Sequence, residues 1–316
     1  MKIRDLVSII LFIIVIGTVV FGLSYYRSQK PLETGLPVQV KVTPRFIFNI
    51  YEGKNKLVRP LGISKDRNNL VYVSNNDGQS VEVFTANGRS KRSLGGRGQQ
   101  PGEFLYPYGI GILPNGNLIV SETGNSRVQE LTPQGKYVKT FVGTENSLDL
   151  GKPGPIYVDS KGHVYIGDLS GSQVLVLNQD AELLHKIKNI SYPHGIAVDE
   201  ENRKLYISDA KEVRIKVFSL DKLENGPVAV IENYLPGQRF SMLRGLAVDN
   251  LGRLYVVDTI VNAIRVFDKN GSYLFSFGRQ GFGDGEFLFP NQIFADNSGK
   301  IFISDWGNNR VQVWGY

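Results

Sequence analysis

A short sequence pattern that occurs six times limits the possible fold more than any other feature of this chain. The copies start 40 to 50 residues apart, at Pro60, Pro107, Pro153, Pro193, Leu243 and Pro290. Each start opens an apolar segment, and two or three further short apolar segments follow, separated by turns such as Pro114-Asn-Gly. Four strands at this period are typical of propeller blades. We therefore predict an all-β fold, a six-bladed propeller of four-stranded antiparallel blades.

The sixth copy is short by one strand. It ends after three apolar segments, whereas residues 45–51 form an additional segment ahead of the first full copy. Pairing of these two parts of the chain would close the ring and leave no free sheet edge. We expect residues 45–316 to form the propeller, with 45–51 as the closing strand of the last blade. The 35 glycines among 316 residues suit a chain with many tight turns.

The first 44 residues differ in character from the repeats. Residues 6–26 carry no charge, and 21 helical residues span about 31 Å, enough for a bilayer core. We predict a short head (1–5), a transmembrane signal anchor (6–26) and a Pro-containing tether (27–44). A cleaved secretory signal is the alternative. The anchored form predicts a single-pass membrane protein with its propeller outside the cytoplasm.

Two glycine-rich connectors and one turn carry a family resemblance. The connectors read Gly96-Arg-Gly-Gln-Gln-Pro-Gly-Glu-Phe104 and Gly281-Phe-Gly-Asp-Gly-Glu-Phe287, and the turn reads Asp305-Trp-Gly-Asn-Asn-Arg-Val311. With the repeated strands, these segments resemble NHL repeats over residues 45–316. The resemblance implies a six-bladed propeller used mostly as a binding platform, although some related propellers are lyases or lactonases. Fold alone does not choose between these functions.

Acidic residues recur at the end of the second strand of most copies, and three of them have an arginine five residues later. The pairs are Glu122 with Arg127, Asp209 with Arg214, and Asp305 with Arg310. Across a hairpin turn this spacing places opposite charges on neighbouring strands. A ring of ligand-binding carboxylates is one interpretation. We favour structural ion pairs, because the pairs repeat together with the fold.

The residue after each repeat start is expected to lie at the mouth of the central channel. These residues are Leu61, Tyr108, Gly154, His194, Arg244 and Asn291. Tyr108, His194, Arg244 and Asn291 would form a polar mouth able to hold a small acid or a peptide end. A polar lining of a water-filled channel, with no ligand, is the other interpretation.

The sequence offers few metal ligands or catalytic groups. Zinc lyases of this propeller class hold the metal with several axial histidines, but His194 is the one histidine at an axial position, and His163 and His185 lie elsewhere in their repeats. Calcium lactonases use axial Glu, Asp or Asn ligands, of which Asn291 is a single match, although Asp or Glu from the ends of the second strands could contribute. The chain has no cysteine. We therefore predict no catalytic residues, no metal and no cofactor.

We expect a membrane-anchored binding or scaffold propeller outside the cytoplasm, rather than an enzyme. Its partner would be a protein, peptide or glycan, and its role could include sensing. A calcium- or zinc-dependent lyase or lactonase is the alternative function. The net charge is +6, but the first 44 residues contribute +3 (five Lys or Arg, two acids), so the repeats are nearly balanced and no nucleic-acid partner is expected. Neither the ligand nor the oligomeric state follows from the sequence.

Overall fold

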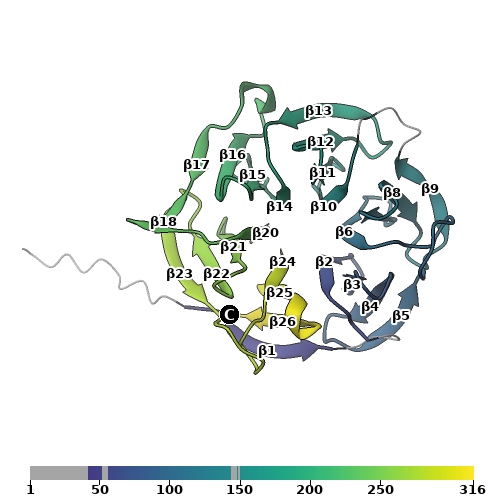
Figure 1. Ribbon diagram of the computed structural model, residues 1–316, viewed down its shortest axis with the longest axis horizontal. Coiled ribbons are helices and arrows are strands. Elements are labelled where there is room, and N and C mark those ends of the chain that lie inside the picture. The colour runs from purple at the N-terminus through teal and green to yellow at the C-terminus, as the bar shows by residue number, and fades with distance from the viewer. Residues whose placement is uncertain (1–41, 52–55, 144–147, 149) are drawn as a thin grey trace, which may run out of the picture. The chain divides into compact units, whose positions relative to one another are not determined.

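Six four-stranded antiparallel sheets surround a central axis in the computed structural model of this chain (Figure 1). The structure describes residues 42–51, 56–143, 148 and 150–316. Residues 43–316 form one unit. The six-bladed propeller predicted from the repeats is confirmed. The predicted anchor, residues 6–26, and most of the predicted tether lie outside the described residues.

Each of the first three blades is a meander whose first strand lies nearest the axis (Figure 1). The first blade contains β2 (Pro60–Lys65), β3 (Leu70–Asn75), β4 (Ser80–Thr85) and β5 (Ser90–Leu94). The second contains β6 (Pro107–Ile112), β7 (Leu118–Glu122), β8 (Arg127–Leu131) and β9 (Tyr137–Val142). The third contains β10 (Pro153–Val158), β11 (Val164–Asp168), β12 (Gln173–Leu177) and β13 (Leu183–Lys188).

The remaining blades keep this strand order with two differences. A separate hairpin is inserted before the fifth blade, and the outer strand of the sixth blade is supplied by residues 45–50. The fourth contains β14 (Pro193–Asp199), β15 (Lys204–Asp209), β16 (Arg214–Ser219) and the short β17 (Ala229–Ile231). A separate hairpin, β18 (Asn233–Leu235) and β19 (Gln238–Arg239), precedes the fifth blade. The fifth contains β20 (Leu243–Val248), β21 (Leu254–Asp258), β22 (Ala263–Phe267) and β23 (Tyr273–Phe277). The sixth contains β24 (Pro290–Ala295), β25 (Lys300–Asp305), β26 (Arg310–Gly315) and β1 (Arg45–Ile50).

Strand β1 closes the ring. It pairs antiparallel with β26, from Arg45 opposite Gly315 to Ile50 opposite Val311, and so supplies the outer strand of the sixth blade. Figure 1 shows β1 beside β26, although these strands come from opposite parts of the sequence. The closing strand predicted at 45–51 therefore ends one residue earlier in the structure.

The core lies between neighbouring blades. Strand β7, for example, is buried along its whole length because each of its faces packs against an adjacent blade. One hydrophobic cluster joins the first two blades and contains Tyr72, Val83, Phe104 and Leu118. Continuous apolar runs in the second strands follow from this packing. Among the described residues, no helix is long and apolar enough to cross a membrane.

Candidate functional site

A β-bulge at the start of every innermost strand directs side chains toward the axis. In β14, for example, Pro193 pairs with Asp209, but the next pair joins Ile196 to Ile207, so His194 and Gly195 leave the regular ladder. The innermost strands of the other five blades have a shift at the same place. Bulges re-aim side chains and are common beside binding sites. This geometry places the residue after each repeat start at the channel mouth.

Serines on the second strands stabilise the bulges. The Ser121 hydroxyl accepts a hydrogen bond from Gly109 N (2.7 Å) and donates one to the Gly154 carbonyl of the next blade (2.6 Å). Ser74 makes the same two contacts between the first and second blades. These bonds satisfy a backbone group that the bulge removes from the ladder, and they fix the spacing of the blades at the mouth.

Three of the four predicted mouth residues form one hydrogen-bonded row. Arg244 Nη1 lies 2.6 Å from His194 Nε2, and His194 Nδ1 lies 3.0 Å from the Tyr108 hydroxyl. A guanidinium only donates, so Nε2 accepts and the neutral ring carries its proton on Nδ1. His194 therefore donates to the Tyr108 oxygen, which leaves the Tyr108 proton for another acceptor. Asn291, the fourth residue, contacts only Gln292 in this network, at 3.5 Å.

Burial and the adjacent Arg244 guanidinium lower the pKa of His194 to about 3. Both effects act on the charged imidazolium, which is poorly solvated and lies beside a cation. Burial also raises the pKa of Tyr108. The two rings are neutral near pH 7, and Arg244 carries the positive charge of the row.

The depressed pKa of His194 predicts a pH-dependent stability. Between about pH 6.5 and 3 the unfolded chain binds a proton at this residue that the folded chain does not, so this contribution to stability is complete above pH 6.5 and is lost as the pH falls. We expect His194→Gln to show a smaller drop in melting temperature between about pH 7 and 4.5 than the wild type. Nitrogen-15 NMR of the wild type should show the neutral Nδ1–H form throughout this range. An imidazolium signal near pH 5 would contradict the assignment.

Gln292 completes the mouth and was not among the predicted site residues. Its Nε2 donates to the His194 carbonyl (2.7 Å) and lies 3.5 Å from the Tyr108 hydroxyl, so the side chain links the sixth blade to the fourth and second. Most repeats have glycine here, because the next blade lies too close for a Cβ atom: at Gly195 it would be 2.2 Å from the Arg244 carbonyl. The sequence signal was therefore the departure from Pro-x-Gly-Ile in Pro290-Asn-Gln-Ile293.

An aliphatic collar lies below this polar layer. It consists of the residue three positions after each repeat start: Ile63, Ile110, Ile156, Ile196, Leu246 and Ile293. These residues line a cavity of about 470 Å³ that extends to the turns after the innermost strands, at the end of the channel opposite to the mouth. Lys65 and Asp296 form an ion pair of 2.5 Å at that end. The channel thus has a polar mouth and an apolar middle section.

The carboxylates at the ends of the second strands bind the backbone of their own blades. Glu122 Oε2 accepts from Leu105 N at 2.9 Å, and Asp305 Oδ1 accepts from Leu288 N at 2.7 Å. In every blade, the acid or Asn75 accepts the N–H of the residue two positions before the repeat start. These groups hold the connector that enters each innermost strand.

The three predicted acid and arginine pairs differ in geometry. Arg127 Nε lies 2.7 Å from Glu122 Oε1, and Arg310 Nε lies 2.8 Å from Asp305 Oδ2. Arg214 Nε, in contrast, is 3.9 Å from Asp209 Oδ2, and Lys216 Nζ is closer at 2.8 Å. Residues 214 and 216 share one face of β16, so the two cations compete for one carboxylate, and the less exposed lysine occupies it.

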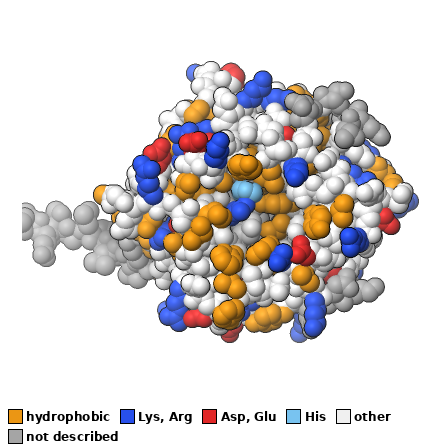
Figure 2. All heavy atoms as spheres, in the orientation of Figure 1, with side chains coloured by type: hydrophobic (Ala, Val, Ile, Leu, Met, Phe, Trp, Pro, Cys, Tyr) orange, Lys and Arg blue, Asp and Glu red, His pale blue; other side chains and the backbone are white. Residues whose placement is uncertain are grey.

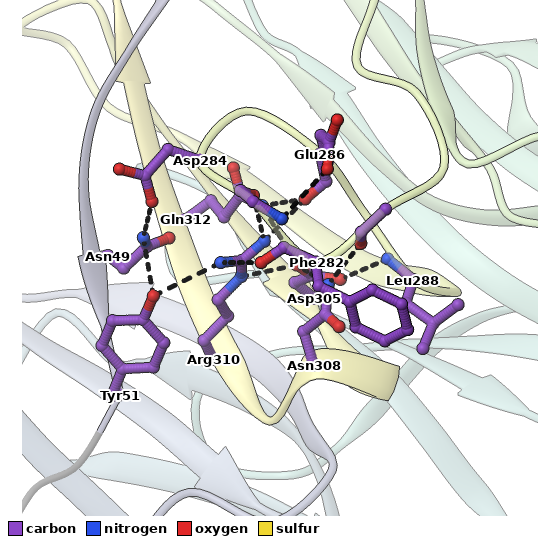
Figure 3. Close-up of polar contacts among 12 residues, drawn as sticks. Asn49, Tyr51, Phe282, Asp284, Glu286, Leu288, Asp305, Asn308, Arg310 and Gln312 are labelled. Atoms are coloured by element: carbon purple, nitrogen blue, oxygen red, sulfur yellow. Dashed lines mark hydrogen bonds and ion pairs between the residues drawn. The ribbon is translucent and has the colours of Figure 1, made fainter.

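Arg310 also holds the connector of the sixth blade, as Figure 3 shows. Its guanidinium donates to the carbonyls of Phe282, Gly283 and Glu286 at 2.7 to 3.1 Å, in addition to Asp305. The Tyr51 hydroxyl, just after the closing strand, lies 3.4 Å from Nη1. Arg127 binds the connector carbonyls of Gln99, Gln100 and Glu103 in the same way. Arg127 and Arg310 therefore each bind the backbone of a connector loop, in addition to pairing with an acid on the neighbouring strand.

The channel mouth does not fit the metals of related propellers. Its side chains supply a guanidinium, a phenol, a neutral imidazole whose Nε2 already accepts from Arg244, and two amides. Calcium requires several oxygen ligands, mainly carboxylates, and catalytic zinc requires about three protein ligands. Within the described residues no group of three His, Asp or Glu side chains could hold a metal ion. His163 binds Asp159 and His185 is exposed, and neither joins His194 at the mouth.

Comparison with known proteins places this fold in a family. A family model described as the SMP-30/Gluconolactonase/LRE-like region matches residues 63–277, and a second, described as a 6-bladed beta-propeller, matches residues 242–315. The chain belongs to the SMP-30/gluconolactonase/LRE-like family. NHL repeat-containing protein 3 of Homo sapiens is 27% identical over 176 residues, which are 50% of each chain. The resemblance to NHL-repeat propellers is confirmed.

Solved structures of this propeller family's fold include enzymes. A gluconolactonase from Xanthomonas campestris aligns with a TM-score of 0.68 and 16% identity, covering 87% of this chain and 95% of that one. The virginiamycin B lyase of Staphylococcus aureus aligns with a TM-score of 0.59 and 16% identity, covering 84% and 83%. At this identity the likeness establishes the fold. The chain spans half or less of the length of the first curated relatives that it matches.

Proposed function

We propose that the channel mouth is a small-molecule site for a ligand with an oxyanion, such as a carboxylate. The proposal is supported mainly by the hydrogen-bonded row from Arg244 through His194 to Tyr108. The groups of this row that remain available for hydrogen bonding are donors. Arg244 Nε is buried and has no hydrogen-bond partner among the described residues. The Tyr108 proton is also uncommitted in this row. An incoming acceptor with negative charge would satisfy both groups.

The family match changes the balance between the two functions left open by the sequence. Membership of a family whose model is described by gluconolactonase favours the lyase or lactonase alternative over a scaffold for a protein, peptide or glycan. Our second candidate is therefore turnover at the same mouth. Arg244 and Tyr108 would stabilise negative charge that develops on a substrate oxygen. His194, with a pKa of about 3, is a poor base near neutral pH, so this candidate rests on family membership more than on geometry.

Substitution of Arg244 tests the proposed site. We expect full-length wild-type protein to bind at least one of a panel of small carboxylates (glycolate, propanoate, gluconate and 3-phenylpropanoate) in ligand-observed NMR. Arg244→Ala should weaken that binding about ten- to hundredfold, because it removes a charged hydrogen-bond donor. The melting temperature should change little, because the Arg244 side chain is only half-buried.

Arg239→Ala is the matched control, because Arg239 is exposed on the β18–β19 hairpin. Unchanged carboxylate binding by Arg244→Ala would overturn the proposed site. Turnover is tested separately with lactone and ester substrates. Activity that Arg244→Ala removes and that survives treatment with EDTA would support the second candidate, in keeping with the donor set at the mouth.

A further inference from the structure

Aromatic side chains surround the channel mouth in alternate blades. Tyr106, Tyr192 and Phe289 directly precede the innermost strands of the second, fourth and sixth blades, two residues before Tyr108, His194 and Asn291. All three are exposed, at 44%, 53% and 44%. Figure 2 shows the result on this face: histidine and basic side chains at the centre, with hydrophobic side chains around them.

The backbone at these three aromatic residues is unfavourable for large side chains. Their φ angles are 53°, 54° and 50°, in the left-handed region that Gly and Asn prefer and that is rare for bulky residues. Two of them are held there by the preceding blade: Gln79 Oε1 accepts from Tyr106 N at 2.8 Å, and Asn262 Oδ1 accepts from Phe289 N at 2.7 Å. About half of the surface of each of these side chains stays exposed in the fold. Large, half-exposed apolar surfaces at strained positions beside a polar channel mouth are typical of a binding role.

Tyr106, Tyr192 and Phe289 are here called the aromatic rim. Tyr192 connects this rim to the hydrogen-bonded row of Arg244, His194 and Tyr108. Its ring stacks on His194 with a centroid separation of 6.4 Å and an interplanar angle of 10°, and His194 stacks in turn near Tyr108. In the other three blades the residue directly before the innermost strand is Arg59, Lys152 or Met242. None of the six residues at this position is acidic. A ligand at the mouth would meet cations in the centre and on the rim, with apolar rings between them.

We infer that the mouth selects a small hydrophobic carboxylate, with the carboxylate at Arg244 and Tyr108 and an aromatic or aliphatic body among Tyr106, Tyr192 and Phe289. This inference rests on the proposed function, because it adds a body to the anion proposed above. Flat rings favour stacked or edge-on contact with such a body. Small polar acids would keep the ionic contact and lose the apolar one.

The test compares three ligands that share parts of one structure: 3-phenylpropanoate, propanoate and 3-phenylpropanamide. We expect the full-length chain to bind 3-phenylpropanoate at least tenfold more tightly than either of the others, measured by titration against a protein-free blank. The triple variant Tyr106→Asn, Tyr192→Asn and Phe289→Asn should lose that advantage over propanoate. Asn tolerates the left-handed backbone, so the fold should persist, which the melting temperature checks.

A control variant replaces exposed apolar residues far from the rim, Val138→Ala, Leu184→Ala and Leu251→Ala, and should keep the preference. Equal binding of propanoate and 3-phenylpropanoate would overturn this inference and leave the anion site standing. An unchanged preference in the asparagine triple variant would also overturn it. Failure of every carboxylate to bind, or binding that Arg244→Ala does not weaken, would overturn the proposed function itself.

Discussion

Arg310→Ala should lower the free energy of unfolding by about 3–5 kcal/mol, which is the usual cost of removing one partner from a buried ion pair. Arg310 is 2% exposed and its partner Asp305 is fully buried. The substitution also removes the hydrogen bonds of the guanidinium to the carbonyls of Phe282, Gly283 and Glu286. Because the same guanidinium reaches Tyr51 beside the closing strand, the loss falls where the ring is joined. Chemical denaturation of the wild type and the variant measures the difference.

A second arginine in the same blade provides the comparison. Arg279 pairs with Glu286 at 3.0 Å, but its side chain is 81% exposed. Exposed pairs contribute roughly 0–1 kcal/mol, so Arg279→Ala should have little effect. Equal destabilisation by the two variants would show that burial of Arg310 is not the cause. Arg310→Lys should be intermediate, because a lysine keeps the charge but cannot reach several carbonyls at once.

Gly195→Ala should be destabilising by about 3 kcal/mol, at the upper end for overpacking of a buried site. The added Cβ would lie 2.2 Å from the Arg244 carbonyl and 2.9 Å from Leu246 N, and neither backbone atom can move without the innermost strand of the fifth blade. The displaced strand carries Arg244. We therefore expect carboxylate binding to weaken together with the stability.

The chain offers a matched glycine. Gly96 lies in a connector, and a Cβ there would meet nothing within 4 Å. Gly96→Ala should change the melting temperature little and leave ligand binding intact. If Gly195→Ala behaved like Gly96→Ala in both measurements, the close approach of neighbouring blades would not be the reason for the glycine in the repeat.

The fold could be predicted because every blade repeats one pattern. Pro107-Tyr-Gly-Ile110 and its counterparts combine a buried start, a mouth residue and, in four of the six copies, a glycine that faces the next blade. Six weak signals therefore point to the same structure. Closure by residues 45–50 followed from counting strands. The β18–β19 hairpin could not be predicted in this way, because it belongs to no repeat. Its Leu235 is 40% exposed.

The site was predicted less completely than the fold. Repeat position placed Tyr108, His194 and Arg244 together, but the repeat gives no information on which ring nitrogen carries a proton or how burial shifts the pKa of His194. Gln292 was missed because it departs from the glycine of the repeat, and a departure from a repeat does not by itself indicate a functional residue. The preference of Asp209 for Lys216 over Arg214 depends on side-chain reach within one strand, which spacing alone does not determine.

Closure by β1 has a consequence for biosynthesis. A ribosome makes β1 before the first five blades and β24–β26 after them, so the outer strand of the sixth blade must wait, unpaired, while all the others emerge. Ile50, at the C-terminal end of β1, pairs with Val311, and nearly the whole propeller sequence lies between them. Contacts between residues so far apart in the sequence form slowly. Until β24–β26 leave the exit tunnel, β1 has no partner strand and could pair with another molecule. We therefore expect the rate at which β24–β26 are translated, and chaperones that cover an unpaired strand, to affect the yield of closed rings.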